Sequence, residues 1–125
     1  MEFPEDLRYS PEHEWVRVDG SHAVVGITDF AQDALGDVVY VQLPDTGLQV
    51  VANASIAEIE STKSVSEVYS PVSGRVVEVN QTLEDQPEQV NTDPYGTGWI
   101  FAVELAELSE PDGLMDAAAY RALVT

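Results

Sequence analysis

Short runs of β-prone residues, separated by turn residues at close spacing, limit the folds that this sequence can adopt. The runs alternate apolar and polar residues or are rich in valine and isoleucine, and glycine, proline or aspartate stands between them. The expected strands are residues 14–18, 22–27, 38–43, 48–51, 56–60, 65–69, 75–79 and 99–103, with Asp19-Gly20 as a hairpin turn. Many short strands joined by tight turns are typical of a β-sandwich or a flattened barrel. We therefore expect a mainly β fold.

Two helices should accompany the strands. Thr28 or Asp29 can cap a short helix after the second strand, and Gly36 stands where a C-terminal glycine belongs. A second helix is expected over residues 114–124, because the alanines at 117–119 favour helix. Leu114, Ala118, Arg121 and Ala122 would fall along one side of this helix. The polar, proline-containing stretch 83–89 should form a loop or one helical turn.

Length and composition suit a single domain over residues 1–125 with one modest core, since 44% of the residues are apolar. The chain has no cysteine, which excludes disulfides and thiolate metal sites and fits a reducing compartment. Residues 1–6 are acidic and resemble neither a signal nor a transit peptide. No run is long enough to cross a bilayer. We expect a cytoplasmic monomer.

The formal net charge of −18 restricts the possible partners. Nucleic acids and anionic membranes are disfavoured, because binding them requires basic patches. The charge suits partner proteins with basic docking surfaces, or it serves solubility alone.

Lys63 is the only lysine in the chain. Small polar residues surround it (Ser61, Thr62, Ser64 and Ser66), and apolar β-forming residues lie on both sides. This pattern predicts a hairpin with the lysine at its tip. An exposed ε-amine is a common target for acylation, although a lone lysine can also be an ordinary surface charge. A separate enzyme would have to supply the activated acyl group.

Conventional catalysis has little support. His13 and His22 lack the spacing of a metal site, and His13 stands between Glu12 and Glu14. No nucleophile elbow or phosphate-binding loop is present. The chain is therefore expected not to be an enzyme.

Several motifs together resemble one family, the H protein of the glycine cleavage system, which is a lipoyl carrier. The resemblance covers about Tyr9 to Val124, and glycines stand sixteen residues before and eleven residues after Lys63, as in lipoyl carriers. It implies a lipoyl-domain-like fold with a lysine-tipped hairpin. The motifs are His13-Glu14-Trp15-Val16, Val25-Gly26-Ile27-Thr28-Asp29, Leu35-Gly36-Asp37, Glu60-Ser61-Thr62-Lys63-Ser64-Val65-Ser66, Ser70-Pro71-Val72-Ser73-Gly74, residues 91–99 and Ala117-Ala118-Ala119-Tyr120.

The resemblance implies lipoate in amide linkage to Lys63, attached by a lipoate ligase or a lipoyl/octanoyl transferase. The arm would accept an aminomethyl group from a pyridoxal-phosphate glycine decarboxylase and deliver it to a folate-dependent aminomethyltransferase. A flavin-dependent dihydrolipoamide dehydrogenase would then reoxidise it. The carrier itself would catalyse none of these steps.

The same resemblance implies a surface cleft that shields the loaded arm. Glu14 and Glu67 would face the arm and hold its protonated amine, or else they are ordinary solvated carboxylates. Two positions depart from the family pattern, since Thr62 replaces a usual valine and Glu67 a more frequent aspartate. Other functions stay open: a biotinyl carrier, which usually flanks its lysine with methionine, an unlipoylated binding module, or a carrier that relays lipoate to other enzymes.

Overall fold

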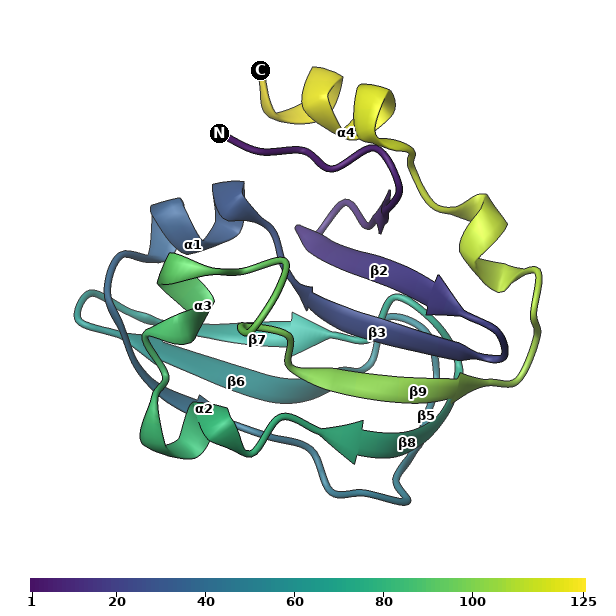
Figure 1. Ribbon diagram of the computed structural model, residues 1–125, viewed down its shortest axis with the longest axis horizontal. Helices are drawn as coiled ribbons and strands as arrows, with labels where there is room; N and C mark the ends of the chain where they lie inside the picture. The colour runs from purple at the N-terminus through teal and green to yellow at the C-terminus, as the bar shows by residue number, and fades with distance from the viewer.

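The computed structural model describes residues 1–125 and contains two antiparallel sheets that do not close into a barrel (Figure 1). The larger sheet has the order β1 (Arg8–Tyr9), β2 (Glu14–Asp19), β3 (His22–Ile27), β9 (Phe101–Leu105), β8 (Gly74–Val79) and β5 (Gln49–Val50). The smaller sheet has the order β4 (Val38–Gln42), β6 (Ser55–Ser61) and β7 (Val65–Tyr69). The predicted mainly β fold is confirmed, and its form is a sandwich of open sheets.

Several strand boundaries differ from the sequence prediction, and two of these differences change the position of a turn or of a core residue. Asp19 pairs with His22, so the turn residues of the first hairpin are Gly20 and Ser21 and not Asp19 and Gly20. Gly20 has a φ of 64°, as in type II′ turns, which place glycine first. The last strand begins at Phe101 and leaves Trp99 outside the sheet, where it packs beside the smaller core described below.

The short helix α1 (Asp29–Leu35) follows the second long strand, as predicted. Thr28 is its N-cap, because its Oγ1 accepts a hydrogen bond from the Ala31 amide at 3.2 Å. Gly36 ends the helix with a φ of 82°. In the stretch 83–89, predicted as a loop or one helical turn, the structure has the one-turn helix α2 (Thr82–Asp85), and a second short helix, α3 (Gln89–Thr92), begins at the end of this stretch.

The C-terminal helix is shorter than predicted. The chain forms a 3₁₀ turn, η1 (Glu110–Gly113), and then the helix α4 (Ala117–Val124). Met115 cannot join the helix because its backbone pairs with Tyr9 through two hydrogen bonds of 2.8 and 3.0 Å. Asp116 instead caps α4 by accepting from the Ala119 amide. Ala117 and Tyr120 are the buried residues of α4, whereas Ala118, Arg121 and Ala122 are exposed.

Two groups of buried side chains stabilise the fold. The larger fills the space between the sheets and draws on both of them. The smaller core consists of Leu7, Tyr9, Trp15, Ala117 and Tyr120 and lies under α4 and the N-terminal segment. The rings of Tyr9 and Tyr120 stack with centroids 4.7 Å apart. This packing holds α4 beside the start of β2 (Figure 1). None of the helices has the length and apolar character needed to span a bilayer.

Candidate functional site

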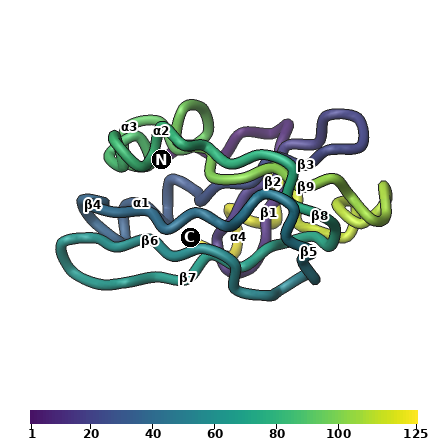
Figure 2. The backbone as a smooth tube through the Cα atoms, turned by 90° about the horizontal axis from the view of Figure 1, so that it is seen from below, coloured from purple at the N-terminus to yellow at the C-terminus, as the bar shows by residue number.

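Lys63 lies in the turn between β6 and β7, at one end of the molecule (Figures 1 and 2). The turn is closed by the Ser61 amide, which donates to the Ser64 carbonyl at 2.8 Å. The Ser61 hydroxyl oxygen also accepts hydrogen bonds from the amides of Lys63 and Ser64, each at 3.1 Å. These hydrogen bonds order the backbone of the turn, and the side chains of the turn point outward.

The Lys63 side chain is exposed and has no carboxylate within 4.0 Å, since the only ion pair in the chain joins Arg75 to Glu104. The Thr62 amide donates to the Asp37 carbonyl at 3.0 Å, which braces the turn against the segment after α1. The stem of Lys63 crosses Gly36, where a Cβ atom would lie 3.1 Å from Lys63 Cε. The Lys63 amine therefore has no ion-pair partner, and hydrogen bonds fix the backbone of the turn that carries it.

A cleft of about 250 Å³ begins directly beside this turn, where Ser64 and Val65 line it. Its apolar wall includes Ala31, Ala34 and Leu35 of α1, and its polar residues include Glu12, His13, Glu14, Ser66 and Glu67. The small alanine side chains keep the space beside α1 open. Pockets that enclose drug-sized ligands usually measure about 300–1,000 Å³, so this cleft suits a slender chain better than a bulky group.

Glu14 lies in this cleft and is only 2% exposed. Its Oε1 accepts a hydrogen bond from the Ser10 hydroxyl at 2.6 Å, and its Oε2 accepts one from the Tyr69 amide at 3.2 Å. Burial raises the pKa of Glu14 to about 7, although the Ser10 and Tyr69 hydrogen bonds act in the opposite direction. A buried carboxyl with no basic partner is suited to receive a cation.

Glu67 also lines the cleft, but its carboxylate is exposed and turned toward its own sheet. It accepts hydrogen bonds from the Ser55 hydroxyl at 3.1 Å and the Tyr69 hydroxyl at 3.0 Å. The structure thus brings both predicted carboxylates to one cleft, with Glu14 buried and Glu67 at the surface.

His13 is a cleft residue to which the sequence assigned no role. Its backbone has a φ of 73°, and its ring Nδ1 lies 2.9 Å from the Tyr120 hydroxyl of α4. Burial lowers the pKa of His13, while Glu12 has the opposite effect. The partner stands 107 positions away in the sequence, so no local signal could have revealed the contact.

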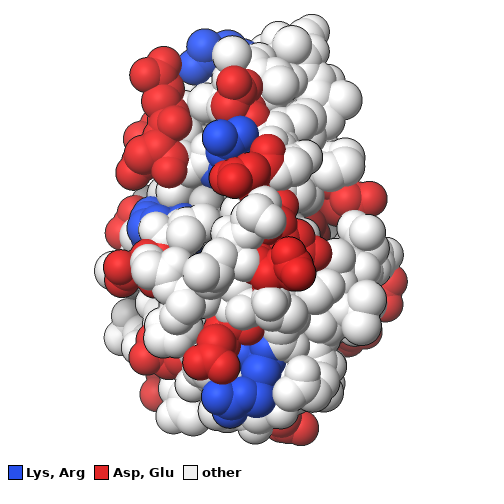
Figure 3. Space-filling model, turned by 90° about the vertical axis from the view of Figure 1, so that its right-hand side faces the viewer, with Lys and Arg blue, Asp and Glu red and all other residues white.

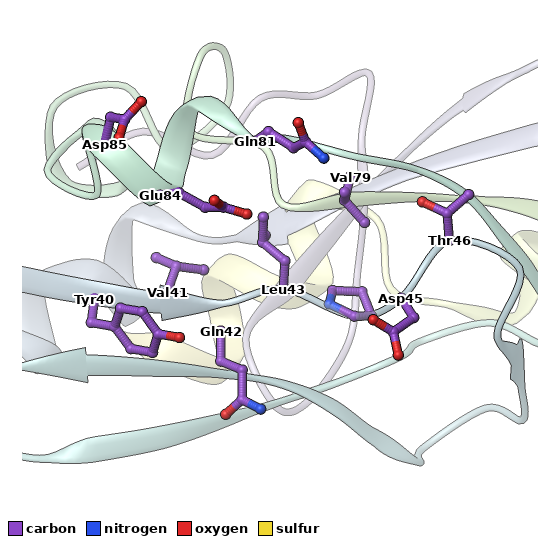
Figure 4. Close-up of a pocket in the computed structure, with 11 residues that line it drawn as sticks. Tyr40, Val41, Gln42, Leu43, Asp45, Thr46, Val79, Gln81, Glu84 and Asp85 are labelled. Atoms are coloured by element: carbon purple, nitrogen blue, oxygen red, sulfur yellow. The ribbon is translucent and has the colours of Figure 1, made fainter.

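The largest cavity, about 580 Å³, lies elsewhere, between β4 and α2 (Figure 4). Leu43 and Val79 point into it, and Asp45, Glu84 and Asp85 surround it. It contains neither a basic side chain nor the lysine turn. The cleft beside Lys63 is therefore the better candidate site.

Comparison with known proteins places the chain in a family. The family model for glycine cleavage H-protein matches residues 7–125. The glycine cleavage system H protein of Beutenbergia cavernae is 58% identical over 125 residues, covering 100% of this chain and 98% of the relative. The protein of the same name from Anaeromyxobacter sp. (strain K) is 57% identical over 124 residues, with 99% and 97% covered.

A solved structure agrees with these matches. The crystal structure of a glycine cleavage system H protein from Mycobacterium marinum has a TM-score of 0.87 and 42% identity, with 95% of this chain and 96% of that chain covered. The chain therefore belongs to the glycine cleavage H-protein family, whose members are lipoyl-carrying subunits of the glycine cleavage system and not catalysts themselves.

Proposed function

We propose that Lys63 carries lipoate in amide linkage and that the cleft beside the turn shelters the end of the loaded arm. The observation that supports this most directly is the place of Lys63, an unpaired amine on a braced turn whose next residues line the cleft. When bound, lipoate supplies sulfur atoms that accept a one-carbon amine unit and are afterwards reoxidised.

Within the cleft, Glu14 is the residue that would hold the amine of the cargo. An ammonium group that enters a buried site gains a charge-assisted hydrogen bond to a carboxylate. The carboxyl of Glu14, with a pKa of about 7, would lose its proton as the cation arrives. The apolar residues of α1 would exclude water around the bound group. Glu67 would act at the rim, because its carboxylate is exposed.

The carrier would exchange cargo with a pyridoxal-phosphate glycine decarboxylase, a folate-dependent aminomethyltransferase and a flavin-dependent dihydrolipoamide dehydrogenase. A lipoate ligase or a lipoyl/octanoyl transferase would attach the arm. Tethering to Lys63 raises the effective concentration of the arm at each docked enzyme.

The distribution of charge supports docking through the sheet that bears Lys63. All four arginines lie on β1, β2, β8 and α4, whereas Lys63 is the only basic residue between β3 and β8. Acidic and basic side chains are interspersed on the face at the right of Figure 1, opposite the lysine turn (Figure 3).

The smaller sheet has a different surface. Glu58 and Glu67 stand directly opposite each other on neighbouring strands, a placement that costs stability because like charges repel. Exposed Tyr40 and Val65 lie on the same sheet as these carboxylates and Glu60. Acidic residues beside exposed apolar ones suit a partner surface with a basic rim.

Reconstitution with a glycine decarboxylase tests the proposed function. Lipoylated wild-type protein should support exchange of bicarbonate into the carboxyl group of glycine, and the Lys63→Arg variant should not. Exchange supported by Lys63→Arg at the wild-type rate would refute the carrier role of this lysine.

A further inference from the structure

A chain of three hydrogen-bonded side chains joins the C-terminal helix to the wall of the cleft beside Lys63. The Tyr120 hydroxyl of α4 lies 2.7 Å from Thr28 Oγ1 and 2.9 Å from Nδ1 of His13. Thr28 and Tyr120 are 0% exposed, so no solvent molecule competes for these hydroxyl groups. His13 is the member of the chain that lines the cleft.

The number of available protons determines the direction of these hydrogen bonds. Thr28 Oγ1 already accepts a hydrogen bond from the Ala31 amide, because Thr28 caps α1. The Thr28 hydroxyl can donate its own proton to the Tyr120 oxygen. The Tyr120 proton then points to His13 Nδ1, which must be an acceptor. In the reverse direction the buried Thr28 proton would have no acceptor, which is costly. Only the first arrangement gives both hydroxyl protons an acceptor.

We propose that Tyr120 is a positioning residue that holds His13 as a neutral imidazole with its proton on Nε2, so that the cleft contains no cation of its own to compete for Glu14. The part of this proposal that concerns cargo rests on the proposed function. In this arrangement the cleft selects a cationic cargo, because Glu14 has no other positive partner.

The surroundings of His13 act on its protonation in opposite directions. The other ionisable groups that line the cleft are Glu12 and Glu14 beside it and Glu67 from β7, and the charge of Glu12 favours a protonated imidazole. Tyr120 packs against the ring from α4, and Phe30 of α1 lies 4.8 Å from it. Burial lowers the pKa of His13, and a hydrogen bond accepted by Nδ1 also favours the neutral ring. Once acylated, Lys63 would no longer carry a charge either.

Nitrogen NMR of the imidazole rings tests the proposal on unmodified protein, before any arm is attached. The expected result is an unprotonated Nδ1 and a protonated Nε2 in His13 near neutral pH. In Tyr120→Phe, which keeps the stacked ring, the His13 titration should move to higher pH. Tyr9→Phe is the matched control, because Tyr9 stacks on Tyr120 but donates its hydroxyl proton to the Pro4 carbonyl. His22, at the far end of β3, provides an internal reference.

A second measurement follows the cargo. The loaded proteins are held at a pH at which His13 is protonated in Tyr120→Phe. The aminomethyl group should then be lost at least three times faster from Tyr120→Phe than from wild type or Tyr9→Phe. A proton on Nδ1 in the wild type, or an unchanged His13 titration in Tyr120→Phe, would overturn the proposal. Because these results do not depend on lipoylation, they are distinguishable from a failure of the carrier function. Equal rates of cargo loss would overturn the role in cargo selection.

Discussion

Glu14 and Tyr69 connect the two sheets at the cleft beside Lys63, where the amide of Tyr69 donates to Oε2 of Glu14 at 3.2 Å. Glu14 begins β2 of the larger sheet, and Tyr69 ends β7, which is an edge strand of the smaller one. The carboxyl thus satisfies a backbone donor that the sheet itself leaves unpaired. A residue proposed to bind cargo is therefore also part of the contact between the sheets.

The buried position of Glu14 should make stability depend on pH. Its pKa of about 7 in the folded state exceeds the ordinary value of 4.5, so the folded protein keeps a proton that the unfolded chain loses between these values. Its contribution to stability is present below pH 4.5 and is lost as the pH rises to 7. Glutamine does not titrate, so position 14 adds no pH dependence to the stability of Glu14→Gln.

The free energy of unfolding measured in urea checks this prediction. The value for wild type minus that for Glu14→Gln should fall by about 3 kcal/mol between pH 4 and 8. Glu107→Gln, which alters an exposed carboxylate away from the cleft, is the control and should give a curve parallel to wild type. A constant difference for Glu14→Gln would contradict the assigned pKa.

The contact between Gly36 and Lys63 gives a prediction with a matched control. Gly36 and Gly47 have φ values of 82° and 95°, so alanine at either position should destabilise the protein by about 1–2 kcal/mol. Only at Gly36 would the new methyl group meet Lys63, because nothing lies within 4 Å at Gly47. The rate of enzymatic lipoylation should fall severalfold in Gly36→Ala and stay near the wild-type rate in Gly47→Ala. Equal rates in the two variants would show that the contact does not position the amine.

Docking through the lysine-bearing sheet predicts a local effect of charge. Glu58 and Glu60 alternate on β6 with the buried residues Ala57 and Ile59, so both carboxylates face outward. The lipoylated Glu58→Gln/Glu60→Gln protein should show a KM for the decarboxylase at least threefold higher at low salt, and high salt should reduce the difference because it screens exposed charges. Asp19→Asn/Glu107→Gln removes two charges from the opposite part of the molecule and should leave KM unchanged. The same KM change in both double variants would indicate a response to net charge alone.

Local patterns explain which parts of the fold were predictable. The strands were predictable from the alternation of apolar and polar residues and from the turn residues between them. The cap at Thr28 was predictable because helix N-termini favour threonine at the N-cap. The start of α4 could not be predicted, because the pairing of Met115 with Tyr9 joins distant parts of the chain. The hairpin tip at Lys63 followed from its small polar neighbours.

The cleft was less predictable than the lysine. The family resemblance indicated the positions of Glu14 and Glu67, but neither motif nor spacing shows that one is buried and the other exposed. The roles of Ser10 and Tyr69 depend on how β2 meets the edge of β7. The contact of His13 with Tyr120 arises only when α4 packs over the start of β2.

Intact mass of protein from cells supplied with lipoate tests the central claim most directly, with Lys63→Arg and Lys63→Arg/Arg75→Lys measured beside wild type. The double variant keeps one lysine but moves it to β8, away from the hairpin tip. We predict one lipoyl group on wild type and none on either variant. An unmodified wild type, or a lipoyl group on either variant, would contradict the claim that Lys63 on its braced turn is the attachment site.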